Sequence, residues 1–523
     1  MNKNKKRPVV LAILDGWGVG PKDKKINAIE AAGPSFFEKI CEKFPYVELN
    51  ATGEAVGLES DQMSGSEAGH LNIGAGRVVK QDVRTILEDI NSGRFFYNPV
   101  FSSSVMQAKR NGSDIHLMGL MGNNDSPHSH PDVFLAILTL IKNYCLNSHN
   151  HIYFHFFTDG RDSFPKSALE HWQKWKKMID KIGIGNLASI TGRFYAMDRA
   201  KNWDRLLKAF EVITLGKGDV FQNIEEAVEF NYKKGNTDEY IEPAIISENG
   251  KPTGIVKNND LVIFFNLRSD RARQFTKFFA GTQVKREKNF PSINYLKGID
   301  FIAMTNFGPD LNVKTAYPTE PIKGTLPFVL SEKRQLYISE TEKFAHVTYF
   351  FNGGYSRPIG GEDRIIINSP KVRSYADKPE MSANEIARVI MKNIKSEVYD
   401  FITVNFPNTD MVGHTGDFEA AVEAVKVVDE KIGAIYDELK KKNGILIVTA
   451  DHGNADVMID QASGRVHTFH TKNPVPFVIV GEDNDIRSIR LREGGVLADI
   501  APTILDLMNI YKPEEMINES LIY

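Results

Sequence analysis

The sequence predicts an α/β fold in which a largely parallel sheet is covered by helices on both faces. One observation is a series of apolar runs with strand character, each followed by a turn or a helical stretch. The runs cover residues 8–14, 114–121, 151–158, 261–267, 301–306, 401–406, 444–450 and 475–480. The chain also has 523 residues, which exceeds one ordinary hydrophobic core. We therefore expect two domains.

Helical periodicity is clearest between Asp417 and Lys442. Apolar residues recur there at steps of three, four or seven, which marks one buried face of a helix. They are Phe418, Val422, Val425, Ile432, Ile435 and Leu439. Glu and Lys occupy the other positions, so we expect an amphipathic helix packed on the sheet.

Composition narrows the class of partner. The 64 basic and 67 acidic side chains nearly cancel, so no global field attracts nucleic acid or an anionic membrane. Cys41 and Cys145 are too few for a disulfide framework and fit a reducing compartment. No apolar run approaches the ~20 residues of a membrane span. We expect a soluble, cytoplasmic, monomeric protein that acts on a small molecule.

Aspartate and histidine residues follow several of the predicted strands. The carboxyl ends of parallel strands meet at one edge of a sheet, where open α/β folds bind ligands. Mixed carboxylate and imidazole groups suit Mn²⁺ or Zn²⁺, and six or so ligands suggest two ions. The candidates are Asp15, Asp410, His414, Asp451 and His452, with His467 and His470 in the loop before residues 475–480.

These ligands come from both ends of the chain, which has a consequence for the domains. If Asp15 joins Asp451, residues 1–80 and 320–523 form one discontinuous domain. Residues 82–310 are then an inserted domain, with hinges near 76–84 and 308–324. Each ligand alone has an ordinary alternative, since a single Asp after a strand is more often a helix cap and a single loop His is usually solvated. The combination favours the metal site.

The segment from Gln62 to Gly76 offers a nucleophile. Its small residues would expose the hydroxyl of Ser64 or Ser66, and a metal ion lowers the pKa of a bound hydroxyl. The alternative is an ordinary helix capped by Ser and ended by a Gly-rich turn. The glycines do not match the dinucleotide-binding spacing, which excludes that interpretation.

The predicted insert carries arginines just after apolar runs. A planar guanidinium group grips phosphate or carboxylate through two hydrogen bonds. The three clusters contain Arg161 with Asp162, Arg193 with Arg199, and Arg268 with Arg271 and Arg273. Any one of them alone could be a surface ion pair. His128, after the run at 114–121, could handle a proton or bind substrate.

Long motifs in this order resemble a known family. They begin Leu14-Asp-Gly-Trp-Gly and Ser66-Glu-Ala-Gly-His-Leu-Asn-Ile-Gly-Ala-Gly-Arg, and they continue with Asp159-Gly-Arg-Asp, Gly192-Arg-Phe-Tyr-Ala-Met-Asp-Arg, Glu340-Thr-Glu-Lys-Phe-Ala-His-Val-Thr, Asp410-Met-Val-Gly-His-Thr-Gly and Thr449-Ala-Asp-His-Gly-Asn. From about residue 8 to about residue 510 the chain resembles the cofactor-independent phosphoglycerate mutases, which do not use 2,3-bisphosphoglycerate.

The resemblance implies a fold and an activity. The fold would be an alkaline-phosphatase-like doubly wound domain, discontinuous in sequence, interrupted by an inserted α/β phosphotransferase domain. The activity would be the interconversion of 3-phosphoglycerate and 2-phosphoglycerate in glycolysis and gluconeogenesis. It would proceed through a phosphoserine at two Mn²⁺ ions, with other divalent ions as alternatives. Rival functions are a related metal-dependent phosphatase, phosphodiesterase or phosphopentomutase, and a catalytically silent metal-binding protein.

The resemblance also implies residue roles. Asp410, His414 and His470 would bind one ion, and Asp15, Ser66, Asp451 and His452 the other. Ser66, not Ser64, would be the nucleophile, and Asp162 the general base assisted by His128. Substrate contacts would be His128, Arg161, Asp162, Arg193, Arg199, Arg268, Arg271 and Lys343. Residue chemistry alone would place Lys343 on the surface.

Two segments depart from the family pattern. Ser64-Gly65 stands where Gly-Asn is usual, which puts the hydrogen bonds around a phosphoserine in question. Residues 122–127, Gly-Asn-Asn-Asp-Ser-Pro, stand where Ser-Asp-Gly-Gly-Val is usual, which puts the position of His128 in question. Neither departure removes a predicted metal ligand.

Overall fold

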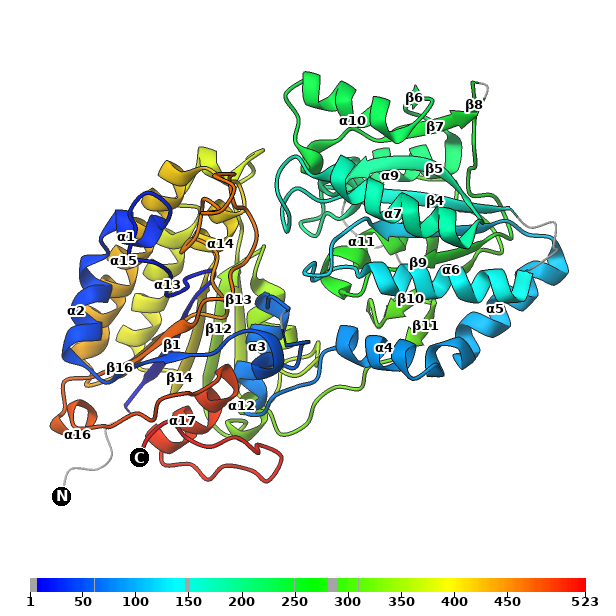
Figure 1. The fold of residues 1–523 in the computed structure, drawn as a ribbon. Coiled ribbons are helices and arrows are strands. Elements are labelled where there is room, and N and C mark those ends of the chain that lie inside the picture. The colour runs from blue at the N-terminus through cyan, green and yellow to red at the C-terminus, as the bar shows by residue number, and fades with distance from the viewer. Residues whose placement is uncertain (1–6, 61, 146–150, 249, 281–288, 309) are drawn as a thin grey trace. The chain divides into compact units, whose positions relative to one another are not determined.

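The computed structural model describes the chain apart from residues 1–6, 61, 146–150, 249, 281–288 and 309. The chain forms two compact units (Figure 1). One consists of Met1–Gln81 and Glu320–Tyr523, and the other of Asp82–Thr319. Each unit is a sheet with helices on both faces, so the predicted α/β class is confirmed.

The sheet of the discontinuous unit has the order β13-β12-β14-β1-β15-β16-β2. The pairs from β13 to β15 are parallel, and β16 and β2 are antiparallel to their neighbours. The strands are β1 (Val9–Leu14), β2 (Tyr46–Leu49), β12 (Gln335–Glu340), β13 (Glu362–Ile367), β14 (Phe401–Phe406), β15 (Ile445–Thr449) and β16 (Val475–Val480). β1 and β14 are buried throughout, as their continuous apolar sequences require.

Helices cover both faces of this sheet. Figure 1 shows α1 (Ala28–Ala32), α2 (Ser35–Lys43), α13 (Ala383–Ser396) and α15 (Phe418–Lys440) on one face, and α3 (Ser66–Ala75), α12 (Leu326–Val329) and α17 (Ile500–Leu507) on the other. Two short helices complete the unit, α14 (Asn408–Gly413) and α16 (Asn484–Arg487).

The helix α15 begins where the sequence predicts it. The Asp417 side chain caps it by accepting a hydrogen bond from the Ala420 amide. The predicted apolar face is buried except at Phe418, which is half-buried because it is the first residue of the helix.

The sheet of the inserted unit has the order β11-β10-β9-β3-β4-β5-β7-β6, with β8 paired to β7. Neighbours from β11 to β5 are parallel, and β7 runs antiparallel to β5. The strands are β3 (Ile115–Leu120), β4 (Ile152–Thr158), β5 (Asn186–Gly192), β6 (Asp219–Phe221), β7 (Ala244–Glu248), β8 (Lys251–Pro252), β9 (Leu261–Phe264), β10 (Asp300–Thr305) and β11 (Lys314–Tyr317).

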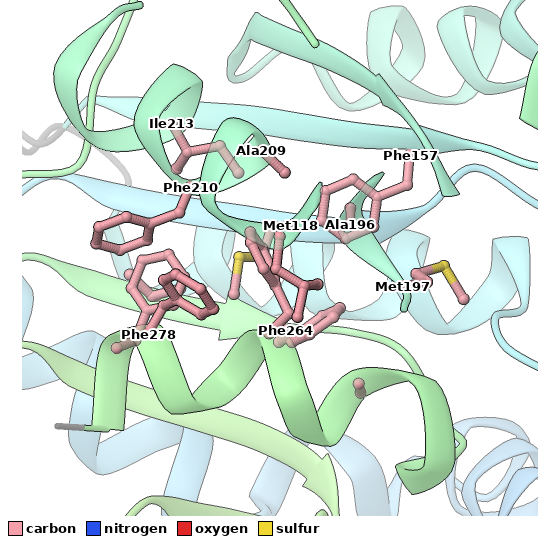
Figure 2. Close-up of a cluster of buried hydrophobic side chains, with 14 of the residues drawn as sticks. Met118, Phe157, Ala196, Met197, Ala209, Phe210, Ile213, Phe264 and Phe278 are labelled. Carbon is pink, nitrogen blue, oxygen red and sulfur yellow. The ribbon is translucent and has the colours of Figure 1, made fainter. Parts of the chain in front are cut away.

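Two aromatic layers enclose this sheet. On one face Phe156 of β4 packs against Phe134 of α6 and Trp175 of α7. On the other, Phe157 packs against Phe275 of α11 in a cluster that includes residues of α9 (Figure 2). The helices are α4 (Asp82–Asn91), α5 (Pro99–Asn111), α6 (Pro131–Cys145), α7 (Ala168–Ile182), α8 (Arg193–Ala196), α9 (Trp203–Leu215), α10 (Ile224–Lys233) and α11 (Ser269–Ala280).

The predicted strands are all present, but the predictions missed others. Each of the eight apolar runs contains a strand, whereas the other strands were not predicted: β2, β5, β6, β7, β8, β11, β12 and β13. Residues 311–319 were left outside both predicted domains as part of a hinge, and in the structure they fall within the unit Asp82–Thr319. They contain β11, which pairs with β10 in the sheet of the inserted unit. No helix in the described part of the chain has the length and apolar character needed to cross a bilayer.

Candidate active site

In the discontinuous unit, four adjacent parallel strands deliver polar residues to one edge of the sheet. Asp15 directly follows β1, and Asp451 lies two residues after β15. Asp410 lies in α14, just after β14, and Lys343 lies three residues after β12. Because the strand order is β12-β14-β1-β15, these side chains become neighbours.

Ser66 is the first residue of α3 and points at this edge. Its Oγ lies 2.9 Å from Nε2 of His452 and donates to Oδ1 of Asp15 at 3.2 Å. The helix starts after Gly65, which has no side chain to cap the helix N-terminus. A helix N-terminus carries partial positive charge and favours an anion. The hydroxyl therefore stands where negative charge is stabilised.

Lys343 is buried, with 2% of its surface exposed, which corrects the expectation that it lies on the surface. Its Nζ lies 2.5 Å from Asp15 Oδ1, 2.5 Å from Ser66 Oγ and 2.6 Å from Asp410 Oδ2. The ammonium group therefore joins the serine to two carboxylates from different strands. A buried lysine needs such partners because an unpaired buried charge is very costly.

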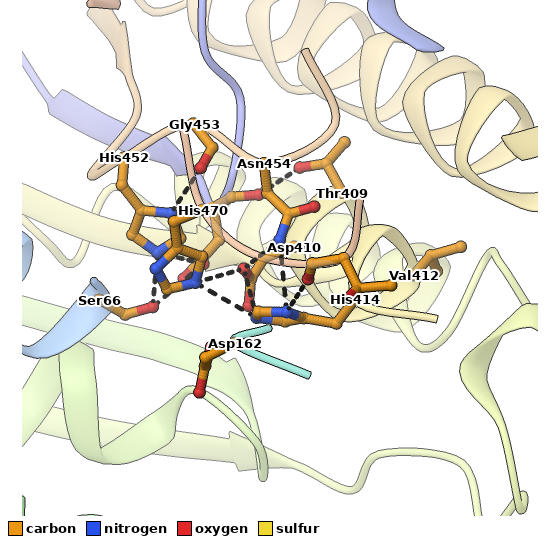
Figure 3. A network of polar contacts seen from close by, with 12 residues as sticks. Ser66, Asp162, Thr409, Asp410, Val412, His414, His452, Gly453, Asn454 and His470 are labelled. Atoms are coloured by element: carbon orange, nitrogen blue, oxygen red, sulfur yellow. Dashed lines mark hydrogen bonds and ion pairs between the residues drawn. The ribbon is translucent and has the colours of Figure 1, made fainter. Parts of the chain in front are cut away.

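A cluster of carboxylate and imidazole groups surrounds Asp410 (Figure 3). Asp410 Oδ1 lies 3.1 Å from His414 Nε2 and 3.3 Å from His470 Nε2. The two imidazole Nε2 atoms are 3.2 Å apart, and each Nδ1 contacts a backbone carbonyl oxygen, of Thr468 and Ser64 respectively. These carbonyl contacts orient the two rings so that each Nε2 faces Asp410.

A second group consists of Asp15, Asp451 and His452. One ligand atom of each lies within 4.8 Å of the others, and the same holds for Asp410, His452 and His470. Asp451 Oδ1 has no hydrogen-bond donor among the described residues, and Oδ2 faces the imidazoles of His70, at 3.2 Å, and His452, at 3.5 Å. A buried carboxylate with so few donors is stabilised by a cation. The two groups therefore fit two divalent ions with nitrogen and oxygen ligands.

Burial and neighbouring charges shift the pKa values of these groups. Burial, together with the charge of Asp451, raises the pKa of Asp15 to about 6. Burial lowers the pKa of His452 to about 3, so its imidazole is neutral and able to bind a metal ion. Burial alone would raise the pKa of Asp410, but His414 and Lys343 outweigh it and hold the pKa well below its usual range.

In the inserted unit, the ends of β9, β3, β4 and β5 carry the predicted anion-binding residues. Arg193 is buried and ion-paired through Nη1 with Asp159 at 2.6 Å and Asp162 at 2.5 Å. The reverse arrangement occurs at Asp270, whose carboxylate is ion-paired with Arg199 at 2.7 Å and with Arg268 at 3.4 Å. Arg271 donates to the Met197 carbonyl oxygen at 3.2 Å. The carboxylates hold the guanidinium groups in fixed orientations.

His128 lies beside Arg193 in this unit. Nη2 of Arg193 is 3.0 Å from His128 Nε2, and Asp162 Oδ2 is 3.5 Å from the same atom. Burial, and then the charges of Arg193 and Arg268, hold the pKa of His128 well below its usual range. Because a neutral Nε2 accepts from Arg193, the ring hydrogen is on Nδ1. That atom has no hydrogen-bond partner within the described ranges.

Comparisons with known proteins decide the family. A model described as the metalloenzyme superfamily matches residues 7–512. The 2,3-bisphosphoglycerate-independent phosphoglycerate mutase of Clostridium kluyveri is 46% identical over an alignment of 525 positions that covers 99% of each chain. That of Clostridioides difficile is 43% identical with the same coverage. The chain belongs to the 2,3-bisphosphoglycerate-independent phosphoglycerate mutases.

A solved structure agrees with this membership. The phosphoglycerate mutase of Leishmania mexicana, studied at low cobalt concentration, matches with a TM-score of 0.90 and 30% sequence identity. The match covers 99% of this chain and 98% of that one. The fold of this family member is therefore that of a phosphoglycerate mutase over its whole length.

Within each unit the structure brings the predicted residues together. Asp15, Ser66, Lys343, Asp410, His414, Asp451, His452 and His470 meet in the discontinuous unit. The His467 ring packs against Phe469 at a tilt, and His467 lies in neither ligand group. In the inserted unit Arg161 is buried at the end of β4, close to Asp162.

Sequence reasoning missed three buried polar residues around the ligand groups. Asn405 donates to Asp15 Oδ2 at 2.6 Å, and His70 Nδ1 lies 3.2 Å from Asp451 Oδ2. Asn454 lies 3.4 Å from His414 Nδ1. Asn405 could have been found from the sequence, because it is a polar residue inside an apolar strand. A buried amide at such a position needs hydrogen-bond partners.

The two departures from the family pattern have local accounts. At the first, the Ser64 carbonyl contacts His470 Nδ1 at 2.7 Å, a contact that any residue type could supply. At the second, Ser126 Oγ accepts from the His128 amide at 3.3 Å, and the His128 carbonyl accepts from the Leu267 amide at 2.7 Å. This backbone pairing holds His128 at the end of β9.

Proposed function

We propose that this enzyme interconverts 3-phosphoglycerate and 2-phosphoglycerate through a phosphoserine on Ser66, at two divalent ions and without 2,3-bisphosphoglycerate. One observation carries the proposal. Ser66 Oγ is in contact with His452, Asp15 and Lys343 at the N-terminus of α3, while family membership supplies the reaction. An ordinary capping serine would have no such surroundings.

Ser66 Oγ would lose its proton and attack phosphorus, the bond from phosphorus to the substrate oxygen would break, and that oxygen would take up a proton to leave bound glycerate. Lys343 Nζ and the N-terminus of α3 would offset the charge that develops on the phosphoryl oxygens. Asp410, His414 and His470 would hold one ion, and Asp15, Ser66, Asp451 and His452 the other. When bound, such ions lower the pKa of a hydroxyl and neutralise phosphoryl charge. The mixed ligands suit Mn²⁺ or Zn²⁺, and the family resemblance favours Mn²⁺.

Residues of the inserted unit would bind the glycerate part of the substrate. Arg161, Arg193, Arg199, Arg268 and Arg271 supply the charge for its phosphate and carboxylate groups. His128 Nδ1–H would donate to a substrate oxygen. Asp162 would accept the proton of the hydroxyl that takes the phosphoryl group back. We further propose a monomer in the cytoplasm, consistent with the two free cysteines.

A direct assay tests the proposal. The enzyme is given 3-phosphoglycerate and Mn²⁺, with no 2,3-bisphosphoglycerate, and 2-phosphoglycerate and inorganic phosphate are both measured. We expect 2-phosphoglycerate from the wild type, none after chelation, and none from Ser66→Ala. Ser64→Ala, whose side chain lies outside both ligand groups, is the matched control. Release of inorganic phosphate faster than 2-phosphoglycerate would indicate a phosphatase instead.

A further inference from the structure

Two buried side chains, Asn405 and His70, contact the proposed metal ligands but have no role in the proposed reaction. Asn405 lies on β14, which pairs with β1, and His70 lies one turn after Ser66 in α3. Both are fully buried. We propose that they act as a positioning pair, which fixes Asp15 and Ser66 in the geometry that binds the ion of the Ser66 group. This inference rests on the proposed function.

The orientation of the Asn405 amide follows from its partners. Oδ1 accepts from Ser339 Oγ at 3.3 Å, and Nδ2 lies 2.6 Å from Asp15 Oδ2. A carboxylate oxygen can only accept, so the amide nitrogen must face Asp15. Its second hydrogen is directed to His70 Nε2, at 3.1 Å. One NH₂ group therefore serves both Asp15 and His70.

His70 carries this chain of contacts to the nucleophile. Because Nε2 accepts from Asn405, the neutral ring has its hydrogen on Nδ1, which lies 2.9 Å from the Ser66 carbonyl oxygen. The same Nδ1 is 3.2 Å from Asp451 Oδ2. The pair thus joins β1, β14 and the first turn of α3 in the order Asp15, Asn405, His70, Ser66.

The contacts also determine which carboxylate oxygen of Asp15 is available to bind the ion. Oδ2 is engaged by Asn405, whereas Oδ1 faces Ser66 Oγ at 3.2 Å. Rotation of the carboxylate would break both contacts. Residues that hydrogen-bond to a metal ligand without binding the metal themselves orient that ligand. Their removal typically lowers metal affinity 10–100-fold. The second ion should depend on them less, because the contacts of the pair run to Asp15, Asp451 and Ser66, which belong to the group of the other ion.

The first test is Asn405→Leu, which removes both donors at similar volume and without a change of charge. Thr403→Val is the matched control, because Thr403 is equally buried two residues earlier on the same face of β14. Titration with Mn²⁺ alone should show two ions bound to the wild type and to Thr403→Val. In Asn405→Leu the affinity for one ion should fall about 10–100-fold and that for the other by less than about threefold.

Variants of His70 separate positioning from general destabilisation. His70→Asn places an amide nitrogen near the position of Nδ1 and keeps a donor for the Ser66 carbonyl, whereas His70→Gln places it near Nε2 and loses that donor. We expect His70→Asn to retain more Mn²⁺ affinity than His70→Gln. The melting temperature of each variant without metal shows whether its fold is destabilised, independently of its Mn²⁺ affinity. If Asn405→Leu does not fold, Asn405→Ser, a smaller change, replaces it.

The outcomes distinguish this inference from the proposed function. Wild-type affinities for both ions in Asn405→Leu and His70→Gln would overturn the positioning pair alone. The proposed function itself would be overturned if the wild type did not bind two ions, or if the Ser66→Ala variant kept full activity. Loss of one ion in the Asn405 and His70 variants, with both ions retained in Thr403→Val, is the result we expect.

Discussion

At the scale of the residue, the position of Lys343 sets the electrostatics around Ser66. Its ammonium group contacts Asp15, Asp410 and the serine hydroxyl, all from other segments of the chain. Such a preorganised donor stabilises developing charge more than a solvated lysine would, because it needs no reorganisation during the reaction.

Replacing this lysine should therefore impair the chemical step. For Lys343→Met we expect kcat to fall about 10²–10³-fold, as for other preorganised donors. The affinity for Mn²⁺ should stay the same or increase, because a competing cation is removed. Steady-state kinetics and a Mn²⁺ titration measure the two effects. Lys333→Met, at an exposed position, is the control. A kcat for Lys343→Met within a few-fold of the kcat of this control would contradict the role assigned to Lys343.

At the scale of the element, the turn after β1 limits what can stand beside Asp410. Gly16 has φ +76°, and a Cβ there would lie 2.8 Å from the Asp410 Cα. Gly33 also has positive φ, +59°, but a Cβ there would have no described atom within 4 Å. Both glycines therefore have a left-handed backbone conformation, but only at Gly16 would a Cβ atom clash with a neighbouring residue.

We expect this difference to appear in stability. Gly33→Ala should lower the free energy of unfolding by about 1–2 kcal/mol, the cost of left-handed backbone for a residue with Cβ. Gly16→Ala should lower it by a further 1–3 kcal/mol or so, because the methyl group overlaps Asp410. Urea unfolding of both variants gives the comparison. Equal losses would show that Asp410 does not restrict this turn.

A second feature at this scale is a buried polar chain across three strands of the inserted unit. His155 Nε2 lies 3.0 Å from His116 Nδ1, and His155 Nδ1 lies 2.8 Å from Ser189 Oγ. His116 Nε2 lies 3.2 Å from Asp260 Oδ2. Burial, and then the proximity of His116, hold the pKa of His155 well below its usual range.

This pKa shift predicts sensitivity to acid. In the unfolded chain His155 binds a proton as the pH falls through about 6.5, whereas in the fold it stays neutral, so stability is lost below that pH. The wild type should lose up to about 1.4 kcal/mol per pH unit relative to His155→Gln. Urea unfolding between pH 7.5 and pH 5.0 measures this, with the exposed His151→Gln as control. Parallel pH profiles for wild type and His155→Gln would refute it.

At the scale of the whole molecule, the chain consists of two units with separate cores. The inserted unit begins and ends at adjacent residues, because Thr319 Oγ1 donates to Asp82 Oδ1 at 3.0 Å. A short linker could therefore join Gln81 to Glu320 without the insert.

Separation of the units should preserve folding and abolish turnover. We expect residues 82–319 alone, and the discontinuous unit closed by a short Gly-Ser linker, each to unfold cooperatively in urea. The closed unit should bind Mn²⁺, because all its proposed ligands lie within it. Neither piece should produce 2-phosphoglycerate. If either piece is unfolded on its own, the two cores are not independent.

Much of the site could be predicted from sequence because its ligands follow strongly apolar strands. Asp15, Asp410 and Asp451 each come shortly after a continuous apolar run, and parallel strands bring such positions to one edge. Lys343 could not be found this way. Its partners Ser66 and Asp15 are 277 and 328 positions away, and long-range contacts alone decide that it is buried.

The missed strands have a similar cause. β5 contains Asn, Ala, Ser, Thr and Gly, so its sequence lacks the continuous apolar character of β1 or β14. β11 is short and begins with a lysine, and it forms a strand because it pairs with β10. In both, tertiary pairing overrides local propensity.

The central claim is that the phosphoryl group passes through Ser66. The most direct measurement is rapid acid quenching of the Mn²⁺-loaded enzyme during turnover of 3-phosphoglycerate, followed by mass spectrometry of the peptide that contains residues 62–76. We predict a phosphoryl group on Ser66 that appears with substrate and is absent from Ser66→Ala. Full turnover with no phosphorylated Ser66, or with the group on another residue, would contradict the account.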